Sequence, residues 1–208
     1  EGSLSHYPDG SLVGVENTSQ GGGGTAYPLE RLDAICKVAR EKNCKLHMDG
    51  ARLFNAAVVS GASPARIVRD FDTVSICLSK GLGAPVGSLL VGSKETLAEA
   101  HRWRKMFGGG MRQSGVIAAA GLYALENNVD RLQEDHRRAR KLAEALNEVP
   151  AFSIVLDTVQ SNIVFIGTGK GKTKEVIAAL SEQGVEILEI DDRSEERRGG
   201  KECRSRWS

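Results

Sequence analysis

The sequence has no long apolar stretch and no export signal. A helix that crosses a bilayer needs roughly 20 predominantly apolar residues, and no such run occurs among the 208 residues. Residues 1–8 lack the basic-then-apolar pattern of a secretory signal peptide. These absences predict a cytoplasmic protein with no membrane association. Because the chain starts at Glu1 rather than Met, we expect the native amino terminus, and any targeting signal, to lie upstream.

Cysteine is scarce and widely spaced. Cys36, Cys44, Cys77 and Cys203 show none of the close pairings of a zinc site, and two of them lie in apolar runs where a free thiol packs as a small hydrophobe. The pattern predicts no metal site and a reducing compartment.

The chain also lacks an excess of either charge, with 28 Lys and Arg against 27 Asp and Glu. This balance predicts neither a nucleic-acid partner nor binding to an acidic membrane. The last sixteen residues, Arg193–Ser208, hold six basic and three acidic residues and show no apolar period. Without them the chain has 22 basic and 24 acidic residues. The segment resembles a vector-derived tail, and we expect it to stand outside the fold.

Between residues 11 and 90, short apolar runs alternate with segments of helical period. This alternation predicts an α/β fold with a mostly parallel sheet. The expected strands are 12–16, 45–48, 73–78 and 88–91. A glycine loop at 21–24 precedes a helix opened by Pro28, and a further helix is expected at 53–60.

The second half has a different pattern. A helix is expected from Ser93 to Met106, and another from Met111 after three glycines. Its span 115–125 has no charge, which predicts that its surface is mostly buried or covered by a partner subunit. A charged surface helix follows at 130–147, with a thin apolar stripe at Leu132, Ala139, Leu142 and Leu146. Beyond Pro150 we expect strands at 152–155, 161–166 and 185–190 and a helix at 173–183. The domains predicted are 1–128, a large domain; 129–192, a connecting helix and part of a small α+β domain; and the tail 193–208.

Two strand ends carry the residues with the most chemical information. Asp49 follows the apolar run before it and precedes Gly50, at the position where open α/β sheets bind ligands. Lys80 lies at the end of another strand, in the loop 79–87 of small residues, where a partly desolvated amine would be a good nucleophile toward a carbonyl. Such a pair matches pyridoxal phosphate, since a carboxylate keeps the pyridine nitrogen protonated and a lysine binds the aldehyde carbon.

The same residues have a simpler interpretation. Asp49 could cap the helix that begins near Arg52, and Lys80 could be an exposed loop lysine. Spacing alone leaves both interpretations open.

Three motifs, HMDGAR, SKGLGAPVGS and RKMFGGGMRQSG, resemble in order and spacing the low-specificity L-threonine aldolase family. The resemblance extends from about Glu16 to Asp191. It implies an aspartate aminotransferase-like fold, that is, fold type I of the pyridoxal phosphate enzymes. It also implies a lyase that cleaves L-threonine and L-allo-threonine to glycine and acetaldehyde.

The resemblance assigns roles to five residues. Lys80 would bind the cofactor aldehyde, and Asp49 would hold the pyridine nitrogen. Arg52 would bind the substrate carboxylate, for which a guanidinium is well suited. Lys105 and Arg112 would lie near the cofactor phosphate of a neighbouring subunit, so a homodimer or homotetramer is implied. From the residues alone, Lys105 and its neighbours could equally form a solvated helix face.

The sequence departs from the family at several points. Where the family has a His near the substrate hydroxyl, this chain has Ser19, a poor base at neutral pH. His47 shares a strand face with Asp49 but receives no role. In the family, the phosphate-binding cup and the ring-stacking residue come from sequence upstream of Glu16, so we expect the chain to be a fragment. The alternatives are a β-eliminating lyase or aminotransferase of the same fold, or a fragment that does not bind cofactor.

Overall fold

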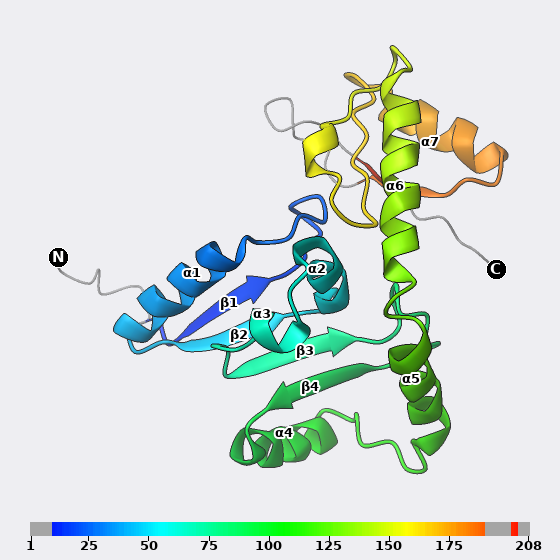
Figure 1. Ribbon diagram of the computed structural model, residues 1–208. Helices are drawn as coiled ribbons and strands as arrows, with labels where there is room; N and C mark the ends of the chain where they lie inside the picture. The colour runs from blue at the N-terminus through cyan, green and yellow to red at the C-terminus, as the bar shows by residue number, and fades with distance from the viewer. Residues whose placement is uncertain (1–9, 190–200, 204–208) are drawn as a thin grey trace. The chain divides into compact units, whose positions relative to one another are not determined.

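The computed structural model describes residues 10–189 and 201–203 and divides into two compact units (Figure 1). Of the described residues, unit 1 comprises 10–18 and 27–130, and unit 2 comprises 19–26, 131–189 and 201–203. The chain therefore passes between the units three times. The short stretch 19–26 belongs to unit 2 although both of its flanks belong to unit 1.

Unit 1 is built on a four-stranded sheet in the order β1-β2-β3-β4. Strands β1 (Leu12–Glu16), β2 (Lys45–Asp49) and β3 (Thr73–Cys77) are parallel, and β4 (Ser88–Gly92) is antiparallel to β3. The predicted α/β class and mostly parallel sheet are confirmed. β4 reverses direction because the loop before it is too short for the crossover that a parallel pair requires.

Four of the helices in unit 1 have recognisable local start or stop signals. α1 (Leu29–Glu41) follows Pro28, α2 (Leu53–Ser60) ends at Gly61 with φ +66°, and α3 (Pro64–Ile67) has Pro at its first position. α4 (Lys94–Met106) is capped by Ser93, whose hydroxyl accepts from the Thr96 N–H. α5 (Gly115–Asn127) begins later than predicted, after Gln113, whose φ of +49° interrupts the helix.

The central strands have one apolar and one polar face. On the first, Leu46 and Met48 are fully buried, Val74 and Ile76 lie beside them, and α1 packs over Leu46 through Cys36 and Ala39. The alternate residues of β2 and β3 are polar and lie on the opposite face: His47, Asp49, Thr73, Ser75 and Cys77. A polar face at the sheet's centre is suited to ligand chemistry rather than to packing.

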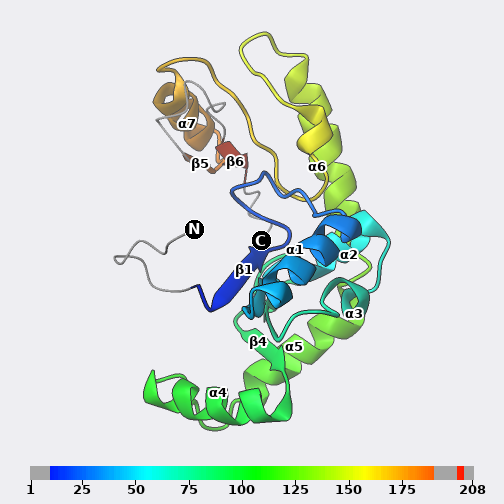
Figure 2. The same ribbon diagram turned by 90° about the vertical axis from the view of Figure 1, so that its left-hand side faces the viewer.

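The helices α4 and α5 expose most of their apolar surface. α4 has no buried residue, and only Gly121 and Ala124 are buried in α5. In both views α4 lies beyond β4, at the edge of unit 1 opposite β1 (Figures 1 and 2). Of the two alternatives for the uncharged span of α5, burial within this chain is not found, because only Gly121 and Ala124 are buried. Cover by a partner subunit stays a prediction.

Unit 2 is organised around α6 (Leu132–Asn147). Its buried face is Leu132, Ala139 and Ala143, whereas Leu142, predicted for the apolar stripe, is 40% exposed. Ile154, Val159, Val164 and Ile166 complete the core. The remaining elements are a 3₁₀ turn, η1 (Leu156–Thr158), the helix α7 (Thr173–Glu182), and two short strands, β5 (Ile187–Glu189) and β6 (Lys201–Cys203).

Two of the strands predicted for unit 2 do not form ladders. Among the described residues, pairing in segments 152–155 and 161–166 is confined to isolated bridges: Ser153 pairs with Gly167, and Phe165 also takes part in a single-residue bridge. The turn η1 follows Val155, and the apolar residues of both segments pack against α6.

The tail was expected to stand outside the fold. Its described part, β6, instead pairs antiparallel with β5. Three residues can pair through backbone groups alone, which a side-chain pattern does not predict. The other tail residues lie outside the described ranges. Within those ranges, no helix is long and apolar enough to span a membrane.

Candidate functional site

The candidate site lies at the carboxyl edge of the three parallel strands. Glu16 is in register with Asp49, and Asp49 with Ser75, so the strand ends lie side by side. Two backbone hydrogen bonds join these ends: the Asn17 N–H donates to the Asp49 carbonyl (3.0 Å), and the Gly50 N–H donates to the Ser75 carbonyl (2.8 Å). The edge is therefore a fixed backbone frame, where open α/β sheets bind ligands.

Asp49 presents its carboxylate at this edge. The side chain is exposed, and its Oδ1 accepts a hydrogen bond from the Ala51 N–H at 3.0 Å. Helix α2 begins at Leu53 with Arg52 in the capping position and no side-chain cap. The alternative in which Asp49 caps this helix is therefore wrong. The bond to Ala51 is a local turn that orients the carboxylate.

Gly50 is required by a close approach between strand ends. A Cβ at this position would lie 3.0 Å from the Ser75 carbonyl oxygen and 3.1 Å from Val74 Cγ1. A side chain would therefore push the end of β2 away from β3, and with it the backbone of Asp49.

Lys80 lies in the loop that follows β3, the neighbour of the Asp49 strand. The loop is anchored by Leu78, Leu82 and Ala84, which are buried, while Lys80 is exposed. The Gly83 N–H donates to the Lys80 carbonyl (2.8 Å), and the Asn128 side chain donates to the Leu82 carbonyl (2.7 Å). The partial desolvation expected for Lys80 is not found in this chain, because small neighbours leave the amine open. Lys80 and Asp49 follow adjacent parallel strands at the same edge.

Arg52 is buried, with 7% of its surface exposed. It occupies the capping position of α2, next to the turn formed by Asp49 and Ala51. This position brings a guanidinium, a good partner for a carboxylate, to the residue that follows the Asp49 turn.

Lys105 and Arg112 lie apart from this frame in the sequence and in the fold. Lys105 is in the last turn of α4, Arg112 precedes α5, and both are exposed. A Cβ on Gly110 would lie 2.6 Å from Lys105 Cδ, so this glycine allows the linker to fold back over the lysine stem. Within this chain, neither residue joins Asp49 and Lys80.

The polar sheet face continues behind Asp49. His47 and Thr73 are in register, and His47 Nδ1 lies 2.7 Å from Thr73 Oγ1. His47 therefore shares the face of Asp49, as the strand alternation predicts, and is held by Thr73. Ser19 is half-buried in the loop that follows β1.

Asn17 and Asn128 support the site but receive no role from the sequence. Asn17 is 1% exposed; its N–H binds Asp49, and its Oδ1 accepts from the Tyr27 N–H at 3.2 Å. In the sequence, an asparagine directly after a predicted strand is a signal that could have indicated such a role, because a buried amide needs hydrogen-bond partners. Asn128 lies far along the chain from the loop it binds, and nothing in its local sequence indicates that contact.

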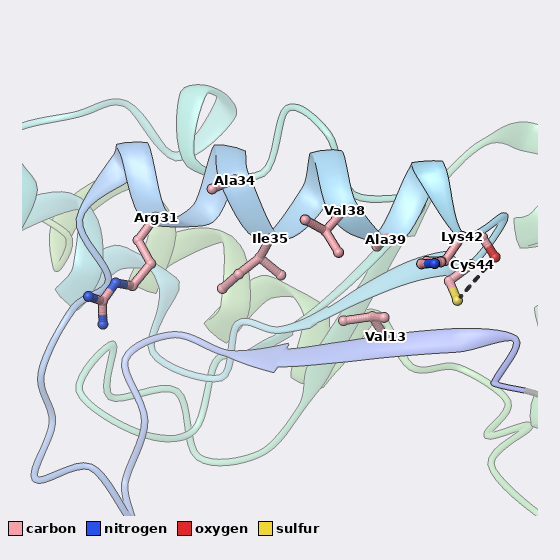
Figure 3. A pocket seen from close by; sticks show the side chains of 8 residues that line it. All are labelled: Val13, Arg31, Ala34, Ile35, Val38, Ala39, Lys42 and Cys44. Carbon is pink, nitrogen blue, oxygen red and sulfur yellow. Dashed lines mark hydrogen bonds between the residues drawn. The ribbon is translucent and has the colours of Figure 1, made fainter. Parts of the chain in front are cut away.

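An apolar hollow in unit 1 lies elsewhere, between α1 and β1 (Figure 3). It has a volume of about 430 Å³. Ile35 and Val38 point from the helix toward Val13 on the strand, with Arg31 and Lys42 at the two ends (Figure 3). A second hollow of about 480 Å³ is lined by charged residues of α1 and the segment before β3. None of the candidate site residues lines either hollow. We therefore place the site at the sheet edge, where its polar groups converge. Across the described ranges, no group of three or more His, Cys, Asp or Glu could hold a metal ion.

Comparison with known proteins adds independent information. Residues 1–168 match the family described as beta-eliminating lyase. The chain is 49% identical over 177 residues to the low specificity L-threonine aldolase of Escherichia coli (strain K12), and the matched region covers 85% of this chain and 50% of that protein. It is 40% identical over 185 residues to low-specificity L-threonine aldolase 1 of Arabidopsis thaliana, covering 88% of this chain and 52% of that one. The chain thus spans about half the length of the curated relatives it matches.

Solved structures share the fold. A candidate aromatic amino acid beta-eliminating lyase/threonine aldolase from Exiguobacterium sp. 255-15 superposes with a TM-score of 0.75 at 26% identity, covering 86% of this chain and 51% of that one. The threonine aldolase of Leishmania major has a TM-score of 0.75 at 20% identity, covering 98% of this chain and 58% of that one. The fold is therefore that of these enzymes, as expected from the three motifs.

Proposed function

Because the chain belongs to the beta-eliminating lyase family, we propose that it carries part of a pyridoxal phosphate-dependent aldolase. The reaction is cleavage of the Cα–Cβ bond of L-threonine and L-allo-threonine to glycine and acetaldehyde. The observation that carries the proposal is the pairing of β2 and β3, which brings Asp49 and the Lys80 loop to one edge of a sheet in a chain 49% identical to a threonine aldolase.

The residues at this edge fit pyridoxal phosphate. Lys80 offers an exposed amine among residues too small to obstruct a planar ring, and Asp49 offers an exposed carboxylate one strand away. When bound, the cofactor supplies an electron sink for the pair of electrons left on Cα as the bond to Cβ breaks.

Each residue then has a distinct task. Asp49 holds a proton at the ring nitrogen, with its carboxylate already oriented by the Ala51 N–H. Lys80 would hold the cofactor by its aldehyde carbon. Arg52 binds the substrate carboxylate through its guanidinium. No described residue is assigned to remove the β-hydroxyl proton, since a serine hydroxyl such as that of Ser19 is a poor base at neutral pH.

We propose that the protein is a homodimer or homotetramer. The apolar surface of α4, α5 and the linker between them includes Trp103, Phe107, Met111, Val116 and Tyr123, all more than half exposed. Exposed apolar residues gathered on one surface mark an interaction site in a soluble protein. A second copy seated there would take Lys105 and Arg112 into the interface, where they would bind the cofactor phosphate of the neighbouring site.

We also propose that the protein is cytoplasmic. The domain boundaries that we propose are those predicted from the sequence, at residues 128 and 192.

A β-eliminating lyase is the second candidate. The family description and the Exiguobacterium relative both name this chemistry, and Asp49 and Lys80 serve either reaction. The two differ in what leaves the substrate: an aldolase breaks Cα–Cβ and releases an aldehyde, whereas elimination removes the Cα proton and the β-substituent.

The test uses the full-length protein with pyridoxal phosphate. We expect a visible absorption band and release of acetaldehyde from L-allo-threonine, both lost in Lys80→Ala. Formation of pyruvate and ammonia from serine, together with no release of acetaldehyde from L-allo-threonine, would favour elimination. Full activity in Lys80→Ala would refute both candidates.

A further inference from the structure

The loop that carries Lys80 is closed by backbone hydrogen bonds. The Leu78 N–H donates to the Gly87 carbonyl (2.9 Å), and the Ala84 N–H donates to the Leu78 carbonyl (3.0 Å). Inside this closure, the Gly83 N–H donates to the Lys80 carbonyl (2.8 Å). Leu78 is thus bonded to two later parts of the loop, and the backbone of Lys80 lies between them in the sequence.

Helix α5, which belongs to the same unit, contacts the loop after Lys80. The Asn128 side chain, in the capping position at the carboxyl end of α5, donates from Nδ2 to the Leu82 carbonyl at 2.7 Å. The Asn128 N–H donates to the Ala124 carbonyl (2.9 Å), so the last turn of the helix holds this residue. Leu82 is itself buried. The bond therefore joins two firmly held parts of unit 1.

The same helix contacts the loop before Lys80. A Cβ on Gly121 would lie 2.8 Å from Leu78 Cδ1, so the Leu78 side chain packs directly against the helix backbone at this glycine. Gly121 and Ala124 are the buried residues of α5, and Asn128 follows Ala124 by four positions. Residues three and four positions apart lie on one face of a helix. A single face of α5 therefore contacts the loop on both sides of Lys80.

We propose that Asn128 is a positioning residue that acts through Leu82. Its hydrogen bond and the contact of Leu78 with Gly121 fix the loop backbone on both sides of Lys80. Because the Lys80 side chain is exposed, the backbone that carries it decides where the amine reaches the sheet edge. The inference rests on the proposed function, in which Lys80 holds the aldehyde carbon of the cofactor. A loop that is already ordered loses less conformational freedom when this contact forms, so the cofactor binds more tightly.

The experiment compares Asn128→Asp with Asn127→Asp in the full-length protein. Asn128→Asp keeps the size of the side chain but replaces the amide with a carboxylate, which cannot donate to the Leu82 carbonyl. Asn127 is a matched control, because its Nδ2 donates to the Tyr123 carbonyl (2.9 Å) within α5 rather than to the loop. Both variants add a negative charge at the same helix end, so the effect of that charge on the helix is common to them.

The first measurement is amide exchange in the cofactor-free protein, at Gly83 and Ala84, whose N–H groups close the loop. We expect Asn128→Asp to speed exchange at both amides on the order of tenfold, the effect of losing one hydrogen bond. Asn127→Asp should leave both amides at the wild-type rate. Gly121→Ala disturbs the helix contact with the loop at a second point and should also speed exchange, which guards against a folding defect specific to Asn128→Asp.

The second measurement is the affinity for pyridoxal phosphate, determined by equilibrium dialysis with and without Lys80. In the protein that retains Lys80, Asn128→Asp should weaken binding several-fold. In a Lys80→Ala background the same substitution should leave the affinity unchanged, because no amine remains to be positioned. This double-mutant cycle separates an effect through Lys80 from a general effect on the unit. Asn127→Asp should have no effect in either background.

Two results would overturn the inference. One is equal exchange at Gly83 and Ala84 in the wild type and Asn128→Asp. The other is an equal loss of affinity from Asn128→Asp with and without Lys80, which would leave Asn128 a purely structural residue. A wild-type protein that binds no pyridoxal phosphate would refute the proposed function and the inference with it, whereas the two results above refute the inference alone.

Discussion

Asp72, which precedes β3, should matter much more for stability than the arginine paired with it. Its Oδ2 accepts from the Leu46 N–H at 2.7 Å and from Arg40 Nη1 at 2.8 Å, and its own N–H donates to the Leu46 carbonyl at 2.9 Å. Leu46 is fully buried at the start of β2, the strand that ends at Asp49. Asp72 therefore binds both backbone groups of a core residue.

The hydrogen bonds that Asp72 accepts from Leu46 and from Arg40 contribute differently to the free energy of unfolding. Replacing Asp72 with alanine leaves the Leu46 N–H without its charged acceptor, and a hydrogen bond to a charged group contributes about 1.5–3 kcal/mol. The Arg40 side chain is 45% exposed, and exposed ion pairs contribute about 0.2–1 kcal/mol. We expect Asp72→Ala to lower the free energy of unfolding by about 2 kcal/mol and Arg40→Ala by about 0.5 kcal/mol.

The assay is urea unfolding of the cofactor-free full-length protein, in which the midpoints of the variants are compared while the slope stays unchanged.

The hydrogen bond from Arg40 is the largest cause that lowers the pKa of Asp72 below its usual value. A carboxyl with a depressed folded pKa stabilises the protein above its unfolded pKa of about 4, and this stability is lost as the pH falls through the folded pKa. The free energy of unfolding of the wild type should thus exceed that of Asp72→Asn by a constant amount near neutral pH, and the difference should shrink below about pH 4. An Arg40→Ala variant as unstable as Asp72→Ala would refute this reasoning.

Four further predictions concern the site and the subunit contact. Lys80→Ala should abolish the cofactor adduct that borohydride reduces, and mass spectrometry finding the adduct on another lysine would contradict the assignment. Asp49→Ala should lower kcat much more than it raises KM, because an unprotonated pyridine is a poor electron sink; normal turnover would remove Asp49 from the mechanism. Gly50→Ala should destabilise the protein by about 1–3 kcal/mol in urea, because its Cβ meets the Ser75 carbonyl, and an unchanged midpoint would show that the strand ends can separate freely. Sedimentation of the full-length protein should show a dimer or larger species, and a fully active monomer would contradict the interface assigned to α4 and α5.

Helices and parallel strands were predictable where their signals are local. The helix 53–60 has the predicted bounds because Gly61 supplies the left-handed residue that ends it. The strand at 12–16 also has its predicted bounds, because an apolar run between turn residues needs no distant partner to be recognised. Segments 152–155 and 161–166 have similar composition but form only isolated bridges among the described residues. Strand formation there depended on tertiary context that composition does not contain.

At the candidate site, topology was predictable and solvation was not. A parallel sheet brings the ends of β2 and β3 to one edge, so the proximity of Asp49 to the Lys80 loop follows from the strand pattern alone. The exposure of Lys80 does not follow, because shielding depends on which side chains from elsewhere cover a loop of small residues. The roles of both residues, and those of Arg52, Lys105 and Arg112, stay predictions.

Two side-chain hydrogen bonds of the fold could not be predicted, because each joins a side chain to a backbone group far away in the sequence. Ser161 and Gly24 are 137 residues apart, and Asn128 and Leu82 are 46 apart. Serine and asparagine are common in loops, where they most often bond to their own neighbours. Their local sequence therefore indicates a turn, whatever they contact in the fold. The catalytic groups that we propose lie at strand ends, where a motif can identify them, whereas these side-chain bonds join segments that are far apart in the sequence.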